Sequence, residues 1–239
     1  MPRSTPPRSL HGHVIHELGK RIVSGQIAPG DLLPREETLA EQMSVSRTAL
    51  REAMKVLTAK GLIESRPKVG TRVRDPRYWQ QLDADVLAWR CENLPTDDFI
   101  EKLIEMREVI EPAASAAAAR HCDADQLARL ETAYAAMADA ADHEAWSAAD
   151  LDFHEAILAA TNNELMMSLF AVIETALGTF FVLSARTAAG QFKYSLPHHE
   201  LVLEAIRRRR PEAARRAMQR LVDDSRANMA QRKHGRKNA

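Results

Sequence analysis

Two helical patterns in the first third of the chain are separated by a turn of only two residues, and this arrangement constrains the fold more than any other feature. A helix over 13–24 comes first, and a short helix is predicted over 36–43. Ser44 and Val45 form the turn, and the next helix begins with Ser46 as its N-cap and runs to about Lys60, where Gly61 stops it. Two helices joined by so short a turn indicate a helix–turn–helix.

The helix that follows the turn has two distinct faces. Arg47, Arg51 and Lys55 recur every fourth residue on one face, with Thr48 beside them, which suits the major groove of DNA. A solvated charged face fits the same pattern. The other face must point to the core because its apolar residues recur with helical spacing: Leu50, Ala53, Met54 and Leu57.

A basic turn follows this helix and is flanked by two short β-like runs. The runs cover 62–65 and 71–73, and the turn between them contains Lys68 and Gly70. We interpret them as a two-stranded wing, in which Gly70 lets the backbone approach a groove closely. Residues 1–74 hold 13 Lys and Arg against 7 Asp and Glu, a net charge of +6, which favours a polyanionic partner for this part.

Residues 19–73 resemble the winged helix of the GntR family of bacterial regulators along their whole length. The segments that carry the resemblance are "SGQIAPGDLLP", "SVSRTALREAMKVLTAKGLI" and the wing "VGTRV". In some members an arginine that touches DNA stands where this chain has Glu37, and Arg35 is our candidate to replace it. From the resemblance and the basic stripe together, the predicted DNA-binding residues are Arg35, Ser46, Arg47, Thr48, Arg51, Lys55, Lys68 and Gly70.

The rest of the chain shows helical patterns and almost no strand signal. Residues 75–206 hold 8 Lys and Arg against 23 Asp and Glu, a net charge of −15, whereas residues 207–239 hold 12 against 3, a net charge of +9. Short loops favour antiparallel neighbours. The predicted helices cover 82–91, 97–121, 124–140, 144–161, 164–186, 196–209 and 211–231.

One acid and two imidazoles form a candidate metal site. Asp150 and His154 lie four residues apart, so both side chains point from one helix face, and His199 begins a later helix. Carboxylate oxygen and imidazole nitrogen suit a divalent ion, zinc first, with manganese, nickel or iron as alternatives. A surface Asp–His pair is the competing interpretation.

The helical part resembles the FCD effector domain of the FadR-type branch of the GntR family. "EMREVIEPAASAAAAR", "AADLDFHEAILAATNNELM" and "HHELVLEAIRRRRPEAARRAM" carry the resemblance. It implies a bundle of six or seven helices with a metal bound by an Asp-x-x-x-His pair and two later histidines. Asp150, His154 and His199 match three ligands, but Leu221 stands at the fourth position and cannot coordinate. The site is then open to water or effector oxygens, or binds metal poorly.

The segment "LDADVLAWRCEN" is most similar to repressors of galactonate and related sugar-acid operons. That resemblance implies a small acidic effector such as an aldonate, with Arg107 gripping its carboxylate through a bidentate pair. Arg107 equally fits a surface ion pair with Glu111, four residues later. Tyr194, Ser195 and Arg226 are further candidates for effector contacts.

These features predict a repressor that leaves a palindromic operator in double-stranded DNA when its effector binds, and that acts as a homodimer. An activator, or a sensor of a fatty acyl group or a dicarboxylate, is the alternative. A metal-dependent hydrolase is a remote one, because no nucleophile elbow or His-Glu-x-x-His motif occurs and we expect no enzyme activity. Two isolated cysteines and an apolar 169–185 stretch interrupted by Glu174 favour a cytoplasmic protein without a membrane span.

The sequence predicts two domains joined by a linker, with a short tail at each end of the chain. Residues 1–9 form a flexible tail, 10–74 the mostly α winged helix–turn–helix, and 75–81 a linker. Residues 82–232 form the all-α effector-binding and dimerisation domain, and 233–239 a basic tail.

Overall fold

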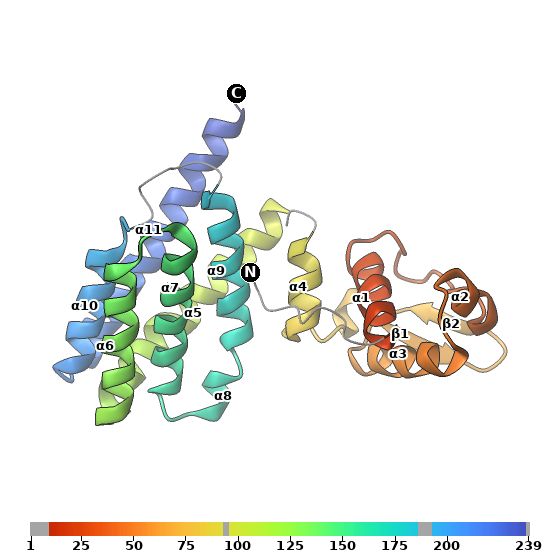
Figure 1. The fold of residues 1–239 in the computed structure, drawn as a ribbon, viewed down its shortest axis with the longest axis horizontal. Helices are drawn as coiled ribbons and strands as arrows, with labels where there is room; N and C mark the ends of the chain where they lie inside the picture. Colours follow the sequence, from red (N-terminus) through yellow and green to blue (C-terminus); the bar gives the residue numbers. More distant parts are fainter. Residues whose placement is uncertain (1–9, 93–95, 186–192, 238–239) are drawn as a thin grey trace. The chain divides into compact units, whose positions relative to one another are not determined.

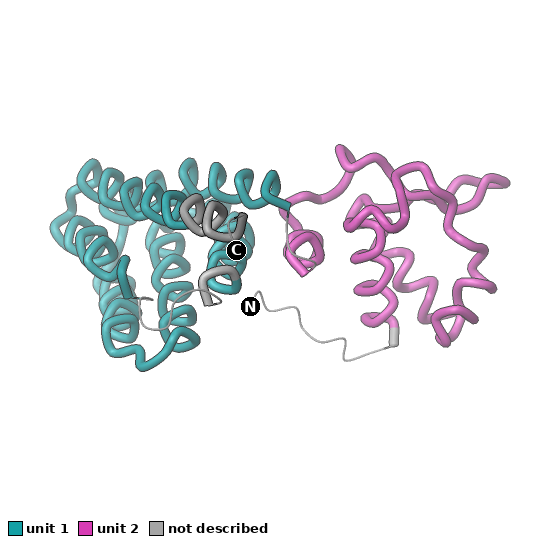
Figure 2. The backbone as a smooth tube through the Cα atoms, turned by 90° about the horizontal axis from the view of Figure 1, so that it is seen from above, with its two compact units in different colours: residues 1, 96–239 teal, residues 2–95 magenta. Residues whose placement is uncertain are grey.

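The computed structural model describes residues 10–92, 96–185 and 193–237, which fall into two compact units. One unit reaches to residue 95 and the other begins at residue 96 (Figure 2). The expected tail 1–9 lies outside the described residues.

The first unit is a helix–turn–helix followed by a small sheet (Figure 1). Helix α1 spans Leu10–Val23, α2 spans Glu36–Gln42 and α3 spans Arg47–Ala59. Strands β1 (Ile63–Arg66) and β2 (Gly70–Val73) pair antiparallel, with Ile63 opposite Val73. The core joins the three helices and the wing, and its fully buried side chains include Leu18, Ile22, Leu50 and Leu57.

The turns of this unit have the local chemistry that the sequence predicts. The Ser46 side chain accepts a hydrogen bond from the Ala49 amide and so caps α3. Gly70 has a φ of +108° at the start of β2, a backbone conformation that favours glycine. Lys68 also has a positive φ, +64°, and is exposed at the tip of the wing.

A helix beyond the wing completes the same unit. Helix α4 (Ala84–Glu92) packs against α1, and the short 3-10 helix η1 (Pro76–Tyr78) leads into it. Trp79 and Trp89 are both buried in the core of this unit, and their indole N–H groups bond to the Arg74 carbonyl and to Nδ1 of His16. The segment expected to be a linker and the start of the effector domain therefore packs with the winged helix, because two large indoles are buried there.

The second unit is entirely helical in its described residues and contains seven helices. Helix α5 packs against α7, α9, α10 and α11, while α6 packs against α7 and α10 (Figure 1). Pro112 lies inside α5, and α11 continues to Lys237, past the expected start of a basic tail at 233. The helices are α5 (Asp97–His121), α6 (Ala124–Asp139), α7 (His143–Ala159), α8 (Glu164–Met167), α9 (Phe170–Ala185), α10 (Leu196–Arg207) and α11 (Pro211–Lys237).

The expected single helix over 164–186 is interrupted, and residue 186 lies outside the described part. The Ser168 hydroxyl bonds to the Glu164 carbonyl, and the Leu169 amide bonds to Met166 and closes the turn between α8 and α9. The stretch Glu164–Val182 is long and apolar enough to cross a membrane by composition alone. Ile173, Leu177 and other residues of α9 are instead buried in the helical core, as expected for a core helix of a folded domain.

Candidate DNA-binding face and buried metal site

The residues predicted to contact DNA all lie in the first unit. Arg47, Arg51 and Lys55 are exposed along α3, and Thr48 is exposed beside them. Arg35 is the exposed residue that precedes α2. Lys68 and Gly70 are exposed on the wing, so the helix and the wing present separate parts of the predicted surface.

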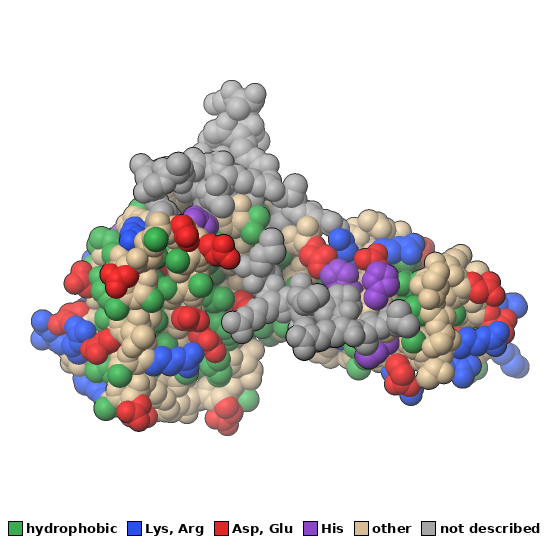
Figure 3. Space-filling model, in the orientation of Figure 1, with side chains coloured by type: hydrophobic (Ala, Val, Ile, Leu, Met, Phe, Trp, Pro, Cys, Tyr) green, Lys and Arg blue, Asp and Glu red, His purple; other side chains and the backbone are tan. Residues whose placement is uncertain are grey.

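Each basic residue of the predicted DNA-contacting face of α3 forms an ion pair with a glutamate. Nη1 of Arg47 lies 2.9 Å from Oε1 of Glu37, and Nε of Arg51 donates to Oε2 of Glu36 at 2.8 Å. Nζ of Lys55 lies 2.8 Å from Glu52 one turn away. Hydrogen bonding to Glu36 and its charge raise the pKa of Arg51, so this guanidinium stays charged. Figure 3 shows basic and acidic side chains intermixed on this unit.

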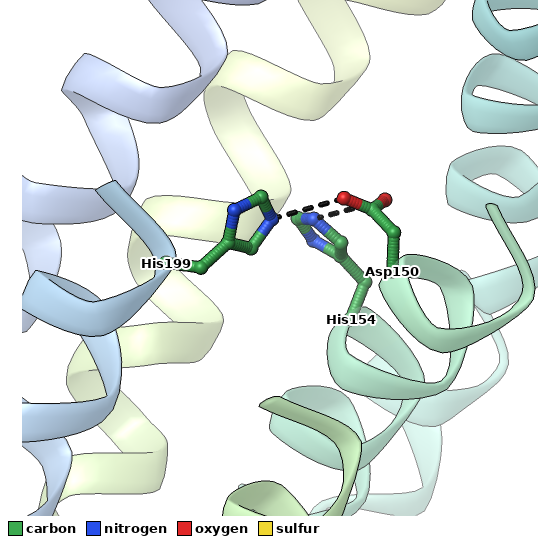
Figure 4. A group of neighbouring side chains, drawn as sticks. All are labelled: Asp150, His154 and His199. Atoms are coloured by element: carbon green, nitrogen blue, oxygen red, sulfur yellow. Dashed lines mark ion pairs between the residues drawn. The ribbon is translucent and has the colours of Figure 1, made fainter. Parts of the chain in front are cut away.

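The predicted metal ligands meet inside the second unit (Figure 4). Asp150 and His154 project from α7, and His199 from the first turns of α10. One ligand atom from each residue lies within 4.8 Å of the other two, and all three side chains are buried. Within the described residues this is the group of His, Cys, Asp or Glu side chains suited to hold a metal ion.

Hydrogen-bond partners fix which nitrogen of each imidazole faces Asp150. Nδ1 of His199 lies 2.9 Å from the Ser195 carbonyl, which can only accept, so this nitrogen carries the proton. Its Nε2 then faces Oδ1 of Asp150, 3.0 Å away. Nδ1 of His154 lies 2.8 Å from Oε2 of Glu111, so its Nε2 faces Oδ2 of Asp150 at 3.8 Å.

When Nε2 of both imidazoles is unprotonated, the two rings and the Asp150 carboxylate direct lone pairs into one small space. Oδ2 of Asp150, Nδ1 of His154 and Nε2 of His199 are buried and make no aligned hydrogen bond in the described structure. Buried polar atoms of this kind require a partner, and either protons or a cation would satisfy these. The arrangement therefore fits a divalent ion, with Nδ1 of His199 held by the Ser195 carbonyl and Nδ1 of His154 close to the Glu111 carboxylate, as outer partners of metal-binding histidines are.

The charges around Asp150 keep it ionised. Burial alone would raise the pKa of Asp150, but contact with His199 and the nearby charges of His154 and Arg107 outweigh burial and lower it. Phe153 packs edge-on against His199 with ring centres 5.3 Å apart, and Trp146 does so at 6.1 Å. The site combines an anionic ligand with an apolar wall that limits access of water.

Arg107 forms the ion pair with Glu111 that its spacing predicts, but the pair is buried rather than on the surface. Nε of Arg107 donates to Oε1 of Glu111 at 2.5 Å, and the two side chains are 3% and 1% exposed. Burial would raise the pKa of Glu111, but Arg107 and His154 together lower it to about 2. Glu111 thus joins the predicted effector residue to a predicted metal ligand, a link that the sequence analysis did not find.

The other predicted effector residues have varied surroundings. Ser195 is buried and contributes its carbonyl to His199, whereas Tyr194 is 36% exposed. Arg226 of α11 forms ion pairs with Glu101 and Glu108 of α5. Arg107 also lines a small cavity of about 10 Å³, together with Ile100, Leu103, Ile104, Ala176, Thr179, Phe180 and Ser225.

Leu221, at the expected fourth ligand position, is a core residue. It is 2% exposed and belongs to the apolar cluster of the helical unit. The donor set from the described part of the protein therefore contains one carboxylate and two imidazoles.

Two family models match the two units. The model of the bacterial regulatory proteins of the gntR family matches residues 10–73, and the model of the FCD domain matches residues 102–224. The first match covers the helix–turn–helix and wing, and the second covers most of the helical unit with all three candidate ligands.

Curated relatives and solved structures agree with these matches. The chain is 35% identical to the uncharacterized HTH-type transcriptional regulator YieP of Escherichia coli (strain K12), over 90% of this chain and 93% of the relative. It is 33% identical to the galactonate operon transcriptional repressor of the same organism, over 89% and 93%. The structure of Streptococcus agalactiae GntR is similar with a TM-score of 0.51 and 26% identity, over 91% of this chain and 99% of that one.

The Listeria monocytogenes regulator Lar shares the fold, with a TM-score of 0.61 and 21% identity over 91% of this chain and 95% of that one. The winged helix, the helical unit and both family matches lead to one assignment. The chain belongs to the GntR family of bacterial regulatory proteins with an FCD domain, and it is a DNA-binding transcriptional regulator.

Proposed function

We propose that this regulator is a repressor released from a palindromic operator by a small carboxylate, with galactonate and similar aldonates as the first candidates. The observation that carries the proposal is the buried group Asp150, His154 and His199 beside Arg107. The similarity to a galactonate operon repressor supports both the class of effector and the direction of the response. Two-fold symmetry of a homodimer matches two operator half-sites.

A divalent cation would be held by Oδ of Asp150 and Nε2 of each histidine. Zinc suits one oxygen and two nitrogens, and manganese, nickel or iron are compatible with the same donors. When bound, the ion supplies positive charge and open coordination positions for effector oxygens. Three protein donors leave such positions because Leu221 contributes an apolar side chain.

An anionic effector would need local positive charge in the helical unit. Residues 96–239, which make up this unit, hold 18 Lys and Arg and 22 Asp and Glu, a net charge of −4, so the surroundings as a whole offer an anion no general attraction. Arg107 together with a cation supplies local positive charge, and a guanidinium can bind a carboxylate in a bidentate manner. Glu111 already contacts Nε of Arg107, so the effector carboxylate would use the remaining N–H donors.

The site must enlarge before an aldonate fits. The cavity beside Arg107 has a volume of about 10 Å³, room for roughly one water molecule. An effector that needs a rearranged bundle binds the closed and open arrangements with different affinities, and only such a difference shifts an equilibrium. This supports a ligand-controlled regulator, and the same argument holds for an activator or for a sensor of a dicarboxylate or fatty acyl group.

The test titrates metal-stripped protein with zinc, manganese and nickel, and then with galactonate, gluconate, a dicarboxylate and a fatty acyl compound. His199→Ala removes a proposed ligand, and His198→Ala is its matched control. His198 is the adjacent residue, is 33% exposed and lies 2.8 Å from Asp224 rather than in the buried group. Binding is followed by calorimetry and by the melting temperature, since a ligand at about 100 times its Kd stabilises by about 2.7 kcal/mol.

We expect wild type and His198→Ala to bind one metal ion and to respond to one class of acid. His199→Ala should lose both responses but bind selected operator DNA as tightly as wild type. If the wild-type protein binds no metal stoichiometrically, or if the two variants behave alike, the metal-dependent site is wrong. Metal binding without a response to any acid would contradict the effector class alone.

A further inference from the structure

The charges of the predicted recognition helix α3 are balanced by acids on its own unit. Arg47, Arg51 and Lys55 each lie within 2.9 Å of a glutamate oxygen. Arg47 and its partner Glu37 are both 65% exposed, so their contact is made at the surface. Attraction to DNA phosphates from this helix is therefore weaker than its sequence suggests.

These ion pairs do not prevent the arginines from binding DNA. Exposed pairs contribute about 0–1 kcal/mol, and salt screens them. A guanine edge or a phosphate can therefore replace the glutamate at Arg47 at little cost. The backbone of Glu37, however, is held in the first turn of α2, so its carboxylate stays within reach of Arg47 when the arginine turns toward DNA.

Arg47 is the first residue of α3, at the end of a recognition helix that reads base edges in the major groove. A carboxylate held next to Arg47 enters the same groove when the helix docks. Phosphates repel it, and in the groove the amino group N4 of cytosine is the donor that Glu and Asp accept from. Glu37 is then unfavourable on most sequences and favourable where such an amino group faces it.

We propose that Glu37 is a specificity-determining residue that selects a base pair presenting an amino group, cytosine foremost, beside the base contacted by Arg47. Arg47 would donate hydrogen bonds to one base, and Glu37 would accept one from the neighbouring base. The two side chains together carry no net charge. This role concerns the DNA-binding unit alone and does not depend on any effector.

The test selects short random-sequence DNA duplexes with the full-length wild type, Glu37→Gln and Glu41→Gln. Glu41 is the matched control because it is an exposed glutamate of the same helix α2, and the ion pairs of Arg47 and Arg51 do not involve it. Both variants remove one negative charge from one helix. Affinity is then measured against salt on the duplex selected by wild type and on a duplex of unrelated sequence.

Glu37→Gln should lose the preference for one base per half-site by about fivefold or more, and it should bind the unrelated duplex more tightly than wild type does. Glu41→Gln should keep every base preference and strengthen binding to both duplexes equally. Glu37→Asp keeps the charge but shortens the side chain, so it should lose the same preference without tighter binding to the unrelated duplex.

The proposal is overturned if Glu37→Gln selects the same bases as wild type at every position, because Glu37 would then act only through general charge. It is also overturned if Glu37→Gln and Glu37→Asp bind no duplex, since Glu37 would then support the fold of the unit. Circular dichroism and melting of each variant separate these two outcomes.

Discussion

At the scale of single residues, Glu111 connects the two halves of the buried polar network. Its Oε1 accepts from Nε of Arg107, and its Oε2 lies 2.8 Å from Nδ1 of His154. One carboxylate therefore neutralises the buried guanidinium and directs Nε2 of His154 toward Asp150. If Arg107 moved toward an effector, Glu111 would move with it and change the position of His154.

Glu111→Gln should destabilise the protein by about 3–5 kcal/mol, because it leaves the buried charge of Arg107 without its counter-charge. The metal affinity should fall by about 10- to 100-fold, the usual effect of losing an outer partner of a histidine ligand. Urea unfolding measures the first effect, and calorimetric metal titration measures the second.

Glu108→Gln is the control for this substitution. Glu108 lies one turn earlier on α5, is 26% exposed and pairs with Arg226, so its loss should change stability by less than about 1 kcal/mol. The pKa of Glu111 is lowered to about 2 from an ordinary value of 4.5. Its stabilising effect is therefore complete above pH 4.5 and lost as the pH falls toward 2. An equal loss in both variants at pH 7, or a difference between Glu111→Gln and wild type that persists unchanged in acid, would contradict this role.

The sequence predicted part of this network for a simple reason. Asp150 and His154 lie four residues apart on one helix, and such pairs share a face by geometry alone. The proximity of His199 depends on how α10 packs in the bundle, so residue chemistry could only suggest it and the family resemblance supported it. Burial of the Arg107–Glu111 pair depends on four surrounding helices, so spacing alone could not distinguish it from a surface pair.

At the scale of elements, α4 is attached to the winged helix through close contact with α1. A Cβ atom added to Gly19 would lie 2.4 Å from Cζ3 of Trp89, so only glycine lets the indole pack this closely. His16 and Lys20 of α1 both contact Glu92 of α4, at 3.3 and 3.1 Å. Helix α4, which follows the wing in the chain, is therefore part of the DNA-binding unit.

Gly19→Ala should destabilise this contact by about 1–3 kcal/mol through overpacking, even though alanine favours a helix. Hydrogen exchange of the α1 and α4 amides, measured on the full-length protein, should become faster while α5 and α7 stay protected. The double variant Gly19→Ala/Trp89→Leu tests the cause, because removal of the indole should abolish most of the added cost. Purely additive effects of the two substitutions would refute a steric contact between them.

Helix positions were predicted well where caps and periodicity mark them. Thr96 accepts from the Phe99 amide and Asp123 forms a capping box with Gln126, which set the starts of α5 and α6. The interruption between α8 and α9 has no glycine or proline to reveal it. The docking of α4 was missed because it depends on Gly19 and Trp89, which are 70 residues apart in the chain.

At the scale of the whole molecule, the proposed function couples a unit that binds DNA to a unit that would bind the effector. A repressor that leaves DNA on effector binding must obey reciprocity, so operator DNA weakens effector binding by the same factor by which the effector weakens operator binding. We expect a factor of about 5–150, the usual range of such coupling. Calorimetry with galactonate on free and on operator-bound protein measures how much the operator weakens galactonate binding. Operator titrations with and without galactonate measure how much galactonate weakens operator binding.

Arg107→Lys serves as the control for these binding measurements, because a lysine keeps the charge but cannot form the bidentate pair with a carboxylate. It should weaken galactonate binding to the free protein while operator affinity without galactonate stays unchanged. Equal galactonate affinity for free and DNA-bound protein would be incompatible with release by the effector. Tighter binding to the DNA-bound form would instead indicate an effector that strengthens operator binding.

Arg47, Arg51 and Lys55 each pair with a glutamate, and this also affects how the regulator is divided between its operator and the rest of the chromosome. General affinity for DNA arises largely from cations that displace counterions from phosphates, and a chromosome offers on the order of 10⁶ or more competing sites. A reading helix with little net charge is sequestered less by bulk DNA. Fewer copies of the protein are then needed to keep one operator occupied.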